Sequence, residues 1–216
     1  MQLVNSRKTV FLDLSLSIDE IWTKQFNSNN RNVIRKAEKE GVNIVESDDY
    51  TSFYELYNRT MINVHAEDYY FFSINYFKTF RDLFARNSTL YLAIYNDRII
   101  AGSMFMFSEI YGHYHLSARD MNYSKFAANN LLLKHGILKA KERGCKYFHL
   151  GGGTTEKNDD SLLLYKKKFS KQSSDFYIGK KIHNQVIYDQ LMNQWKSSFP
   201  EKYEKNKMKL LGYREI

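Results

Sequence analysis

Apolar residues recur along the chain at two spacings, and each spacing predicts one kind of element. Intervals of three and four residues predict amphipathic helices, as with Ile18, Ile21, Trp22 and Phe26. Alternation of apolar and polar residues predicts half-buried strands. The predicted helices cover roughly residues 17–26, 31–40, 49–61, 73–85, 126–143, 159–169 and 184–195, and the predicted strands cover residues 9–14, 42–45, 89–95, 99–107, 111–118, 146–150 and 176–179.

The connections between the middle strands are short and polar, which is typical of hairpins. Residues 96–98 and 108–110 each join two consecutive strands. Helices precede and follow this meander, so the order of elements predicts a mixed α/β fold with a largely antiparallel central sheet flanked by helices. Gly41 and Gly144 directly follow two of the predicted helices, where a residue with positive φ is favoured.

The composition is that of a globular protein with enough residues for a sizeable core. The chain has 216 residues, 43% of them hydrophobic, and its mean hydropathy is −0.56. These values exclude a disordered chain, a collagen and a coiled-coil rod. The sequence contains no run of about 18 apolar residues, so no membrane-spanning helix is expected.

The cysteine content and the N-terminal sequence together favour a reducing compartment. Cys145 is the single cysteine, which excludes disulfides within the chain and a thiolate metal cluster. The first residues lack the apolar stretch of a secretion signal. We therefore expect the protein to be cytoplasmic.

The charge of the chain points to an anionic partner. Lysine and arginine number 32 against 24 aspartates and glutamates, which gives a formal net charge of +8. A nucleic acid, a phosphorylated metabolite and an anionic membrane face all fit this excess. Aromatic residues make up 16% of the chain and favour a packed core.

Three cations share one face of the predicted helix at residues 31–40. Arg31, Arg35 and Lys39 lie at positions i, i+4 and i+8, where like charges repel unless an anion sits between them. Arg35 has the geometry to hold a phosphate through two hydrogen bonds. The alternative is a solvated helix face relieved by Glu38 and Glu40, and charge pattern alone favours that interpretation.

The predicted strand at residues 111–118 carries a polar face. Strict alternation places His113, His115, Ser117 and Arg119 on one side of the sheet. The two histidines suit hydrogen bonding or proton transfer. A half-exposed strand with satisfied histidines explains the same pattern. Two histidines without a third ligand are weak evidence for a metal site, and none is expected.

Two further stretches combine flexible backbone with positive charge. Gly151, Gly152 and Gly153 follow a strand, so they allow either a close approach of backbone to a ligand or a tight turn with positive φ. They match neither a phosphate-binding P-loop nor a dinucleotide fingerprint. Residues 166–168 are three lysines in an apolar frame. One of them is expected to point inward, where its ammonium would stabilise an oxyanion or a phosphate, unless the face is simply solvated.

Taken together, these stretches resemble the Fem-type aminoacyl transferases, the FemABX family, and the related GNAT-like acyltransferases of envelope polysaccharide clusters. The resemblance rests on the order and spacing of several blocks rather than on one motif, and it covers roughly residues 9–192. The blocks are residues 31–42, His115-Leu116-Ser117-Ala118, Ala128-Asn129-Asn130-Leu131-Leu132, Gly144, Leu150-Gly151-Gly152-Gly153, Tyr165-Lys166-Lys167-Lys168-Phe169-Ser170 and Phe176-Tyr177-Ile178-Gly179-Lys180.

The resemblance implies a GNAT-like fold and transfer of an aminoacyl or acyl group to an amine of a peptidoglycan precursor. Aminoacyl-tRNA or acyl-CoA would be a co-substrate, with no resident cofactor. By position, Arg35 resembles the residue that holds the precursor's pyrophosphate, and Lys166 resembles a lysine that stabilises charge during transfer. The expected catalytic residues are Lys166, His115 and His113, and the expected substrate-binding residues are Arg31, Arg35, Arg119, Tyr165, Gly151, Gly152 and Gly153.

Members of the family usually carry two GNAT-like domains, and this chain resembles the second. Residues 1–45 are expected to form an N-terminal strand and linker helices left from a first domain. Residues 46–196 would form the acyltransferase domain, and residues 197–216 a charged tail. A truncated chain, a shortened homologue and one half of an assembly all fit this organisation.

Two alternative functions remain open. The first is a GNAT N-acyltransferase that uses acyl-CoA on an amino-sugar nucleotide. However, residues 119–127 lack the glycines with which classical GNAT enzymes hold the CoA pyrophosphate, so a CoA donor is not supported. The second is a non-catalytic basic module that binds RNA or an envelope partner. The expected partners are a phosphorylated or nucleotide-linked cell-wall precursor, tRNA and a peripheral membrane contact, but not DNA.

Overall fold

The computed structural model describes residues 1–214 and has the mixed α/β fold that the sequence predicts. Its sheet has seven strands in the order β2-β3-β4-β5-β6-β1-β7. The pairs β2–β3, β3–β4, β4–β5 and β1–β6 are antiparallel, whereas β5 and β6 are parallel. The strands are β1 (Gln2–Asp13), β2 (Asn43–Ser47), β3 (Ser88–Tyr95), β4 (Arg98–Phe107), β5 (Tyr111–Arg119), β6 (Tyr147–Gly152) and β7 (Gln172–Lys180).

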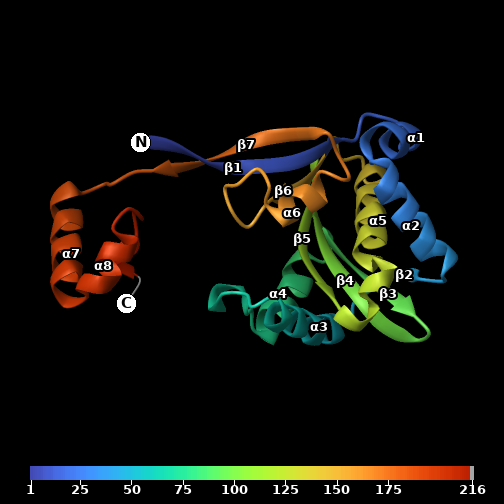
Figure 1. The fold of residues 1–216 in the computed structure, drawn as a ribbon, viewed down its shortest axis with the longest axis horizontal. Helices are drawn as coiled ribbons and strands as arrows, with labels where there is room; N and C mark the ends of the chain where they lie inside the picture. Colours follow the sequence, from blue (N-terminus) through green and yellow to red (C-terminus); the bar gives the residue numbers. More distant parts are fainter. Residues whose placement is uncertain (215–216) are drawn as a thin grey trace. The chain divides into compact units, whose positions relative to one another are not determined.

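Helices α1 to α7 fall close to the predicted ranges, whereas α8 lies within the predicted charged tail (Figure 1). The helices are α1 (Ile18–Glu20), which continues as a π-helical stretch (Ile21–Gln25), α2 (Ser28–Lys39), α3 (Tyr50–Asn63), α4 (Ile74–Phe84), α5 (Ala128–Glu142), α6 (Ser161–Lys166), α7 (Gln185–Ser198) and α8 (Pro200–Asn206). Short 3-10 turns lie at Asp68–Tyr70, Met121–Phe126 and Gly212–Arg214. None of the helices in residues 1–214 is long and apolar enough to cross a membrane.

The chain forms two compact units. The larger unit spans Lys8–Ser174, and the smaller one consists of Met1–Arg7 together with the chain from Asp175 onward. Strands β1 and β7 each have residues in both units. All the candidate site residues belong to the larger unit.

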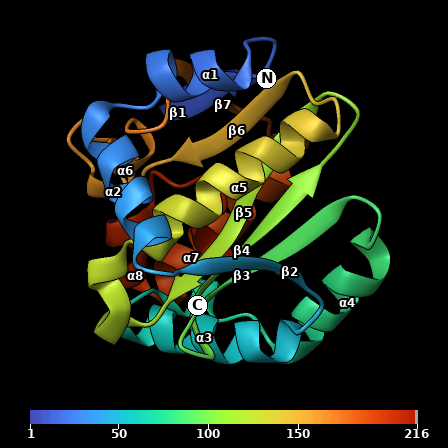
Figure 2. The same cartoon turned by 90° about the vertical axis from the view of Figure 1, so that its right-hand side faces the viewer.

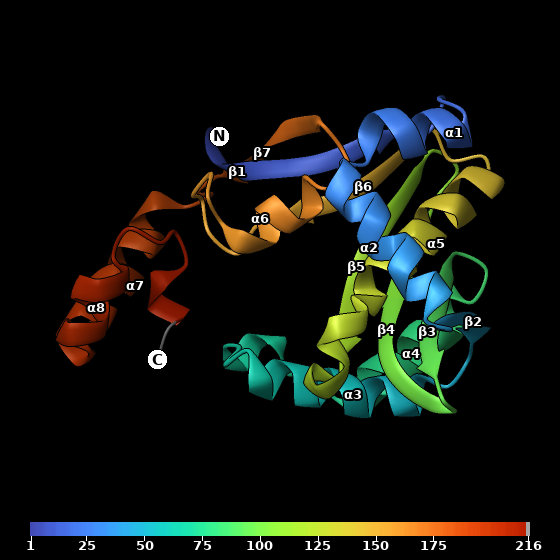
Figure 3. The same ribbon diagram turned by 45° about the vertical axis from the view of Figure 1, so that its right-hand side comes forward.

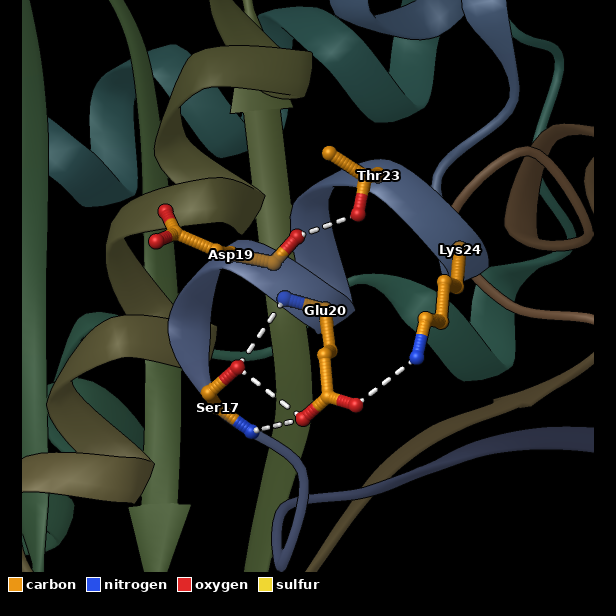
Figure 4. A network of polar contacts seen from close by, with 5 residues as sticks. All are labelled: Ser17, Asp19, Glu20, Thr23 and Lys24. Carbon is orange, nitrogen blue, oxygen red and sulfur yellow. Dashed lines mark hydrogen bonds and ion pairs between the residues drawn. The ribbon is translucent and has the colours of Figure 1, made fainter.

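The first helix begins where the sequence predicts, because Ser17 caps it. The Ser17 hydroxyl accepts a hydrogen bond from the backbone N–H of Glu20, and the Glu20 carboxylate accepts one from the backbone N–H of Ser17 (Figure 4). This reciprocal pair is a capping box. Glu20 also forms an ion pair with Lys24 one turn later. These contacts fix the end of the chain segment that leads out of β1.

Helices cover both faces of the sheet in the larger unit. On one face α5 crosses the strands, with α2 beside it (Figures 2 and 3). Tyr91, Phe105 and Phe148 point toward α5 in the core of that face. On the other face α3 and α4 pack on Leu90, Leu92 and Met104. The alternation along β3 therefore sends neighbouring residues into two different cores, as the period of a strand requires.

Candidate active site

The parallel strands β5 and β6 pair over only three positions and then separate. Tyr111 pairs with Tyr147, Gly112 with Phe148, and His113 with His149. Beyond these pairs β5 continues along β4 and β6 continues along β1. Figure 1 shows β6 running toward α6 while β5 runs toward α3. The carboxyl ends of parallel strands that diverge are where α/β folds bind ligands.

A β-bulge at His115 changes which residues share the polar face of β5. Phe105 of β4 pairs with Tyr114, but the preceding Met104 pairs with Leu116, so His115 is an extra residue. A bulge of this kind shifts the alternation by one position. The predicted single face is therefore wrong beyond His115: Ser117 accepts a hydrogen bond from Asn129 of α5, whereas Leu116 packs in the core beneath α3 and α4.

His113 and His115 lie next to a third histidine, His149 of β6. We call these three residues the histidine row. The Nδ1 atoms of His113 and His149 lie 3.0 Å apart, and their rings stack with centroids 5.1 Å apart. The ring of His115 follows at 6.2 Å from that of His113. Since one Nδ1 must donate to the other, the two paired rings cannot both be protonated.

The histidine row is neutral at physiological pH. Burial lowers the pKa of His113 to about 4, and its neighbours His149 and His115 act in the same direction. Burial also lowers the pKa of His115, and burial together with Lys166 lowers that of His149. A neutral imidazole is able to accept a proton, which suits the proton-transfer role predicted for His113 and His115.

Helix α4 positions His115 through two contacts. The hydroxyl of Tyr76 lies 2.6 Å from His115 Nε2. The ring of Phe80, one turn further along α4, stacks on the imidazole at 5.3 Å with an interplanar angle of 9°. The imidazole is thus fixed on one side by a hydrogen bond and on one face by an aromatic ring.

Lys166 is the inward-pointing member of the three lysines. Its side chain is buried at the end of α6, and Nζ donates to the Gly152 carbonyl at 2.7 Å, while Lys167 is exposed. Lys166 also lies near enough to His113 and His149 to lower the pKa of both. The structure therefore brings together Lys166, Gly152 and the histidine row where β5 and β6 separate.

The glycines before α6 are required by the packing of their own loop. Gly151 has a φ of +79°, a backbone conformation that residues other than glycine rarely adopt. A Cβ on Gly153 would lie 2.4 Å from the Asp160 carboxylate. The carboxylate accepts hydrogen bonds from Thr154, Thr155 and the first turn of α6. Burial alone would raise the pKa of Asp160, but these hydrogen bonds outweigh it and lower the pKa. Gly151 and Gly153 therefore fit a tight turn, and the role of Gly151, Gly152 and Gly153 in substrate binding stays a prediction.

Arg119 and Tyr165 come together on the other side of β5. Burial raises the pKa of Tyr165 well above its usual range, nearby Tyr114 adds to the rise, and Arg119 opposes it. Within residues 1–214 the buried Tyr165 hydroxyl has no hydrogen-bond partner, and neither has Asn129 Oδ1. Arg119 and Tyr165, both predicted to bind substrate, thus belong to a group of polar side chains. Two oxygens of this group, the Tyr165 hydroxyl and Asn129 Oδ1, are left unsatisfied by the described residues.

The basic face predicted for α2 is present. Two of its cations, Arg31 and Arg35, contact Trp22 or the π-helical stretch that contains it. Arg31 donates to the carbonyls of Trp22, Thr23 and Phe26, so it caps the end of the π-helical stretch. Arg35 lies over the Trp22 ring at 5.3 Å and is otherwise exposed. The described contacts link neither arginine to the histidine row. An apolar groove of about 240 Å³ between Trp22 and α5 contains none of the predicted site residues.

Two members of this site, His149 and Tyr76, are not predicted from the sequence. The sequence predicts residues 146–150 only as a strand, without a role for His149, although its alternation with the buried Phe148 and Leu150 places it on the opposite face of the strand. Tyr76 carries no sequence signal, because its role depends on how α4 packs on the sheet. Among residues 1–214 no group of histidine, cysteine, aspartate or glutamate side chains has the arrangement to hold a metal ion.

Comparison with known families and structures gives consistent matches. A family model described as "Acetyltransferase (GNAT) domain" matches residues 24–167. Comparison with curated proteins finds no significant match. Among solved structures, FemX is similar with a TM-score of 0.70 and 18% identity, covering 87% of this chain and 64% of the FemX chain. This chain therefore spans slightly less than two thirds of the FemX length.

Two further structures show the range of proteins that share the fold. L-PGS from Bacillus licheniformis is similar with a TM-score of 0.60 and 13% identity, covering 86% of this chain and 64% of that one. A predicted acetyltransferase with acetyl-CoA from Clostridium acetobutylicum has a TM-score of 0.50 and 17% identity, covering 66% of this chain and 99% of that one. At these identities the likeness establishes the fold.

Proposed function

This chain belongs to the GNAT acetyltransferase domain family, and we propose that it is an acyltransferase that transfers an aminoacyl or acyl group to an amine of a cell-wall precursor. The observation that carries the proposal is the buried Lys166 ammonium, held on the Gly152 carbonyl beside two neutral histidines. This arrangement combines a fixed positive charge with proton acceptors, which acyl transfer to an amine needs.

The reaction requires one bond to form and one to break. The amine nitrogen of the acceptor attacks the carbonyl carbon of an ester or thioester, and the carbonyl oxygen becomes an oxyanion. Lys166 would stabilise that oxyanion, and the histidine row would take the proton that the nitrogen loses. The intermediate collapses when the C–O or C–S bond breaks, and the leaving oxygen or sulfur receives a proton. No covalent enzyme intermediate is needed.

We propose aminoacyl-tRNA as the donor, used as a co-substrate without a resident cofactor. The similarity to FemX supports it, as does the lack of glycine in residues 119–127 before α5. The proposal also assigns the phosphate of the precursor to Arg35, whose guanidinium is exposed on α2. Aminoacyl-tRNA is a cytoplasmic donor, so the reaction would take place in the cytoplasm.

A second candidate is N-acylation by acyl-CoA. The similarity to an acetyltransferase structure with acetyl-CoA favours it, because that chain matches over 99% of its length. The acceptor would then be an amino-sugar nucleotide, with the same residues around the reacting amine.

The donor distinguishes the two candidates. We would incubate the purified chain with a UDP-linked cell-wall precursor or with an amino-sugar nucleotide, each with either aminoacyl-tRNA or acetyl-CoA, and follow the mass of the acceptor. The proposal predicts a mass increase of one aminoacyl residue with aminoacyl-tRNA only. A gain of an acetyl group from acetyl-CoA instead would establish the second candidate. If neither donor modified any amine, the proposal of acyl transfer to an amine would be wrong.

A further inference from the structure

One segment of the larger unit has a charge opposite to that of the whole chain. Residues 60–77 contain no lysine or arginine, although the chain has a net charge of +8. They include Glu67 and Asp68, which are followed directly by Tyr69, Tyr70 and Phe71. We call residues 67–71 the acidic aromatic segment. It forms the connection between α3 and α4 and contains the 3-10 turn Asp68–Tyr70.

The side chains of this segment lie open to solvent. Tyr69 is 78% exposed, Tyr70 43% and Phe71 40%, and the two preceding carboxylates are exposed as well. Neither carboxylate makes a hydrogen bond or an ion pair with any residue of the described chain. A contiguous exposed apolar patch rimmed by polar residues marks an interaction or ligand-binding site.

The segment is nevertheless anchored to the fold. Phe72 stacks between Tyr57 at 6.0 Å and Tyr76 at 4.5 Å, with an interplanar angle of 22° in both pairs. The Tyr57 hydroxyl donates to the Tyr70 carbonyl at 2.9 Å. The exposed rings are therefore presented by a backbone that the core holds in place, which lowers the entropy cost of binding.

The anchored segment lies beside the histidine row. Tyr76, which stacks on Phe72, is also the residue whose hydroxyl lies 2.6 Å from His115 Nε2. Burial raises the pKa of Tyr76, and the hydroxyl of Tyr69 lies near enough to raise it further. The acidic aromatic segment thus lies next to Tyr76 and His115, and His115 belongs to the histidine row that would take up a proton from the acceptor.

We propose that the acidic aromatic segment binds the amino group of the acceptor in its ammonium form. An aliphatic amine is protonated at neutral pH, so it arrives as a cation and must lose a proton before it can attack. The faces of Tyr69, Tyr70 and Phe71 attract a cation, and the carboxylates of Glu67 and Asp68 add to that attraction. The inference rests on the proposed function, whose acceptor is an amine.

The charge of the segment also decides against other ligands that stack on aromatic rings. A nucleic acid strand stacks its bases on such rings, but it also needs cations along its backbone. Here Glu67 and Asp68 would repel phosphate, and residues 60–77 contain no lysine or arginine to offset that repulsion. The ligand that fits both the rings and the carboxylates is a primary ammonium group on an aliphatic chain.

The test compares two probes that differ in the ammonium group. Nα-acetyl-lysine amide carries it, and Nα-acetyl-norleucine amide is nearly isosteric but neutral. Chemical-shift titration of the full chain should give measurable binding for the lysine probe only. Tyr69→Leu should weaken that binding by about two- to fivefold, the range expected for one exposed cation–π contact. Tyr69→Phe, which keeps the aromatic face, should bind as the wild type does.

Two further variants complete the design. Glu67→Gln with Asp68→Asn should weaken binding of the lysine probe and reduce its dependence on salt. Tyr111→Leu removes a tyrosine that is 55% exposed at the start of β5, and it should leave binding unchanged. Equal binding of both probes, or equal effects of Tyr69→Leu and Tyr111→Leu, would overturn the inference.

The outcome separates this site from the proposed function. If the lysine probe binds as described but the protein transfers no acyl group to any amine, the proposed function fails and the ammonium site stands. If transfer to an amine proceeds normally in the Tyr69→Leu and Glu67→Gln/Asp68→Asn variants, the ammonium site is refuted and the proposed function stands.

Discussion

Lys166 is the residue on which the proposed chemistry depends most. Its ammonium is buried and held 2.7 Å from the Gly152 carbonyl, where β5 and β6 separate. We predict that Lys166→Ala lowers kcat of acyl transfer by about 10²- to 10³-fold, because loss of one oxyanion donor typically costs that much. The measurement is the rate of product formation at saturating donor and acceptor.

Its neighbour Lys167 provides a matched control. Lys167 is exposed at the C-cap of α6, directly after Lys166, so Lys167→Ala removes the same charge without touching the site. It should leave kcat unchanged. Because Lys166→Ala also removes a buried hydrogen bond, its folded state must be checked by circular dichroism. A folded Lys166→Ala protein with wild-type kcat would refute the catalytic assignment.

His113 makes stability depend on pH in a defined direction. Its folded pKa is lowered to about 4 by burial and by its neighbours His149 and His115, from an ordinary value near 6.5. Between these values the unfolded chain binds a proton that the folded chain does not. The free energy of unfolding therefore falls as the pH is lowered through this window, and His113 accounts for up to about 3 kcal/mol.

Urea unfolding at pH 7 and at pH 4.5 measures this effect. His113→Gln should lose less stability between the two values than the wild type, because it no longer carries the proton-linked imidazole. His65→Asn is the control: His65 is exposed and has a φ of 52°, which asparagine tolerates. Identical pH dependence of the wild type and His113→Gln would contradict the prediction.

At the scale of elements, α5 can lie close to β4 only because Gly136 has no side chain. A Cβ at this position would lie 2.2 Å from Cε1 of Phe105. We predict that Gly136→Ala destabilises the protein by about 1–3 kcal/mol through overpacking, although alanine is the better helix former. Denaturant unfolding of Gly136→Ala, Phe105→Leu and the double variant forms a mutant cycle.

The double variant tests the stated cause. If the clash with Phe105 is responsible, the smaller leucine should accommodate the new methyl group. Gly136→Ala would then cost less in the Phe105→Leu background than in the wild type. Equal costs in the two backgrounds would show that the effect of Gly136→Ala has another origin.

The elements themselves were largely predictable, whereas the pairing between them was not. Amphipathic spacing and caps placed helices α1 to α7 and most strands correctly, because both depend on residues close together in sequence, but α8 was not predicted. The bulge at His115 arises from how β5 meets Met104 and Phe105 of β4. Nothing in the sequence of β5 indicates it, and it moves Ser117 to the side of α5. The sequence predicts that one of the three lysines at residues 166–168 points inward, and the family resemblance points to Lys166. That Lys166 donates to the Gly152 carbonyl is known only from the fold.

For the whole molecule, the two units differ in how much they bury. The family match at residues 24–167 lies within the larger unit, and so does every residue of the candidate site. In the smaller unit, the buried residues among those the structure describes are Trp195 and Gly212. Helix α5 of the larger unit alone buries seven residues. Since local stability follows buried apolar contact, the smaller unit should open more readily.

Amide hydrogen exchange measures this difference on the full chain. We predict that amides of α7 exchange at least about 100-fold faster than those of α5, which corresponds to an opening free energy about 3 kcal/mol lower. Trp195→Ala removes the main buried side chain of the smaller unit and should accelerate exchange in α7 and α8 while α5 keeps its wild-type protection. If α7 were protected as strongly as α5, or if Trp195→Ala loosened both helices equally, the two units would have to unfold as one.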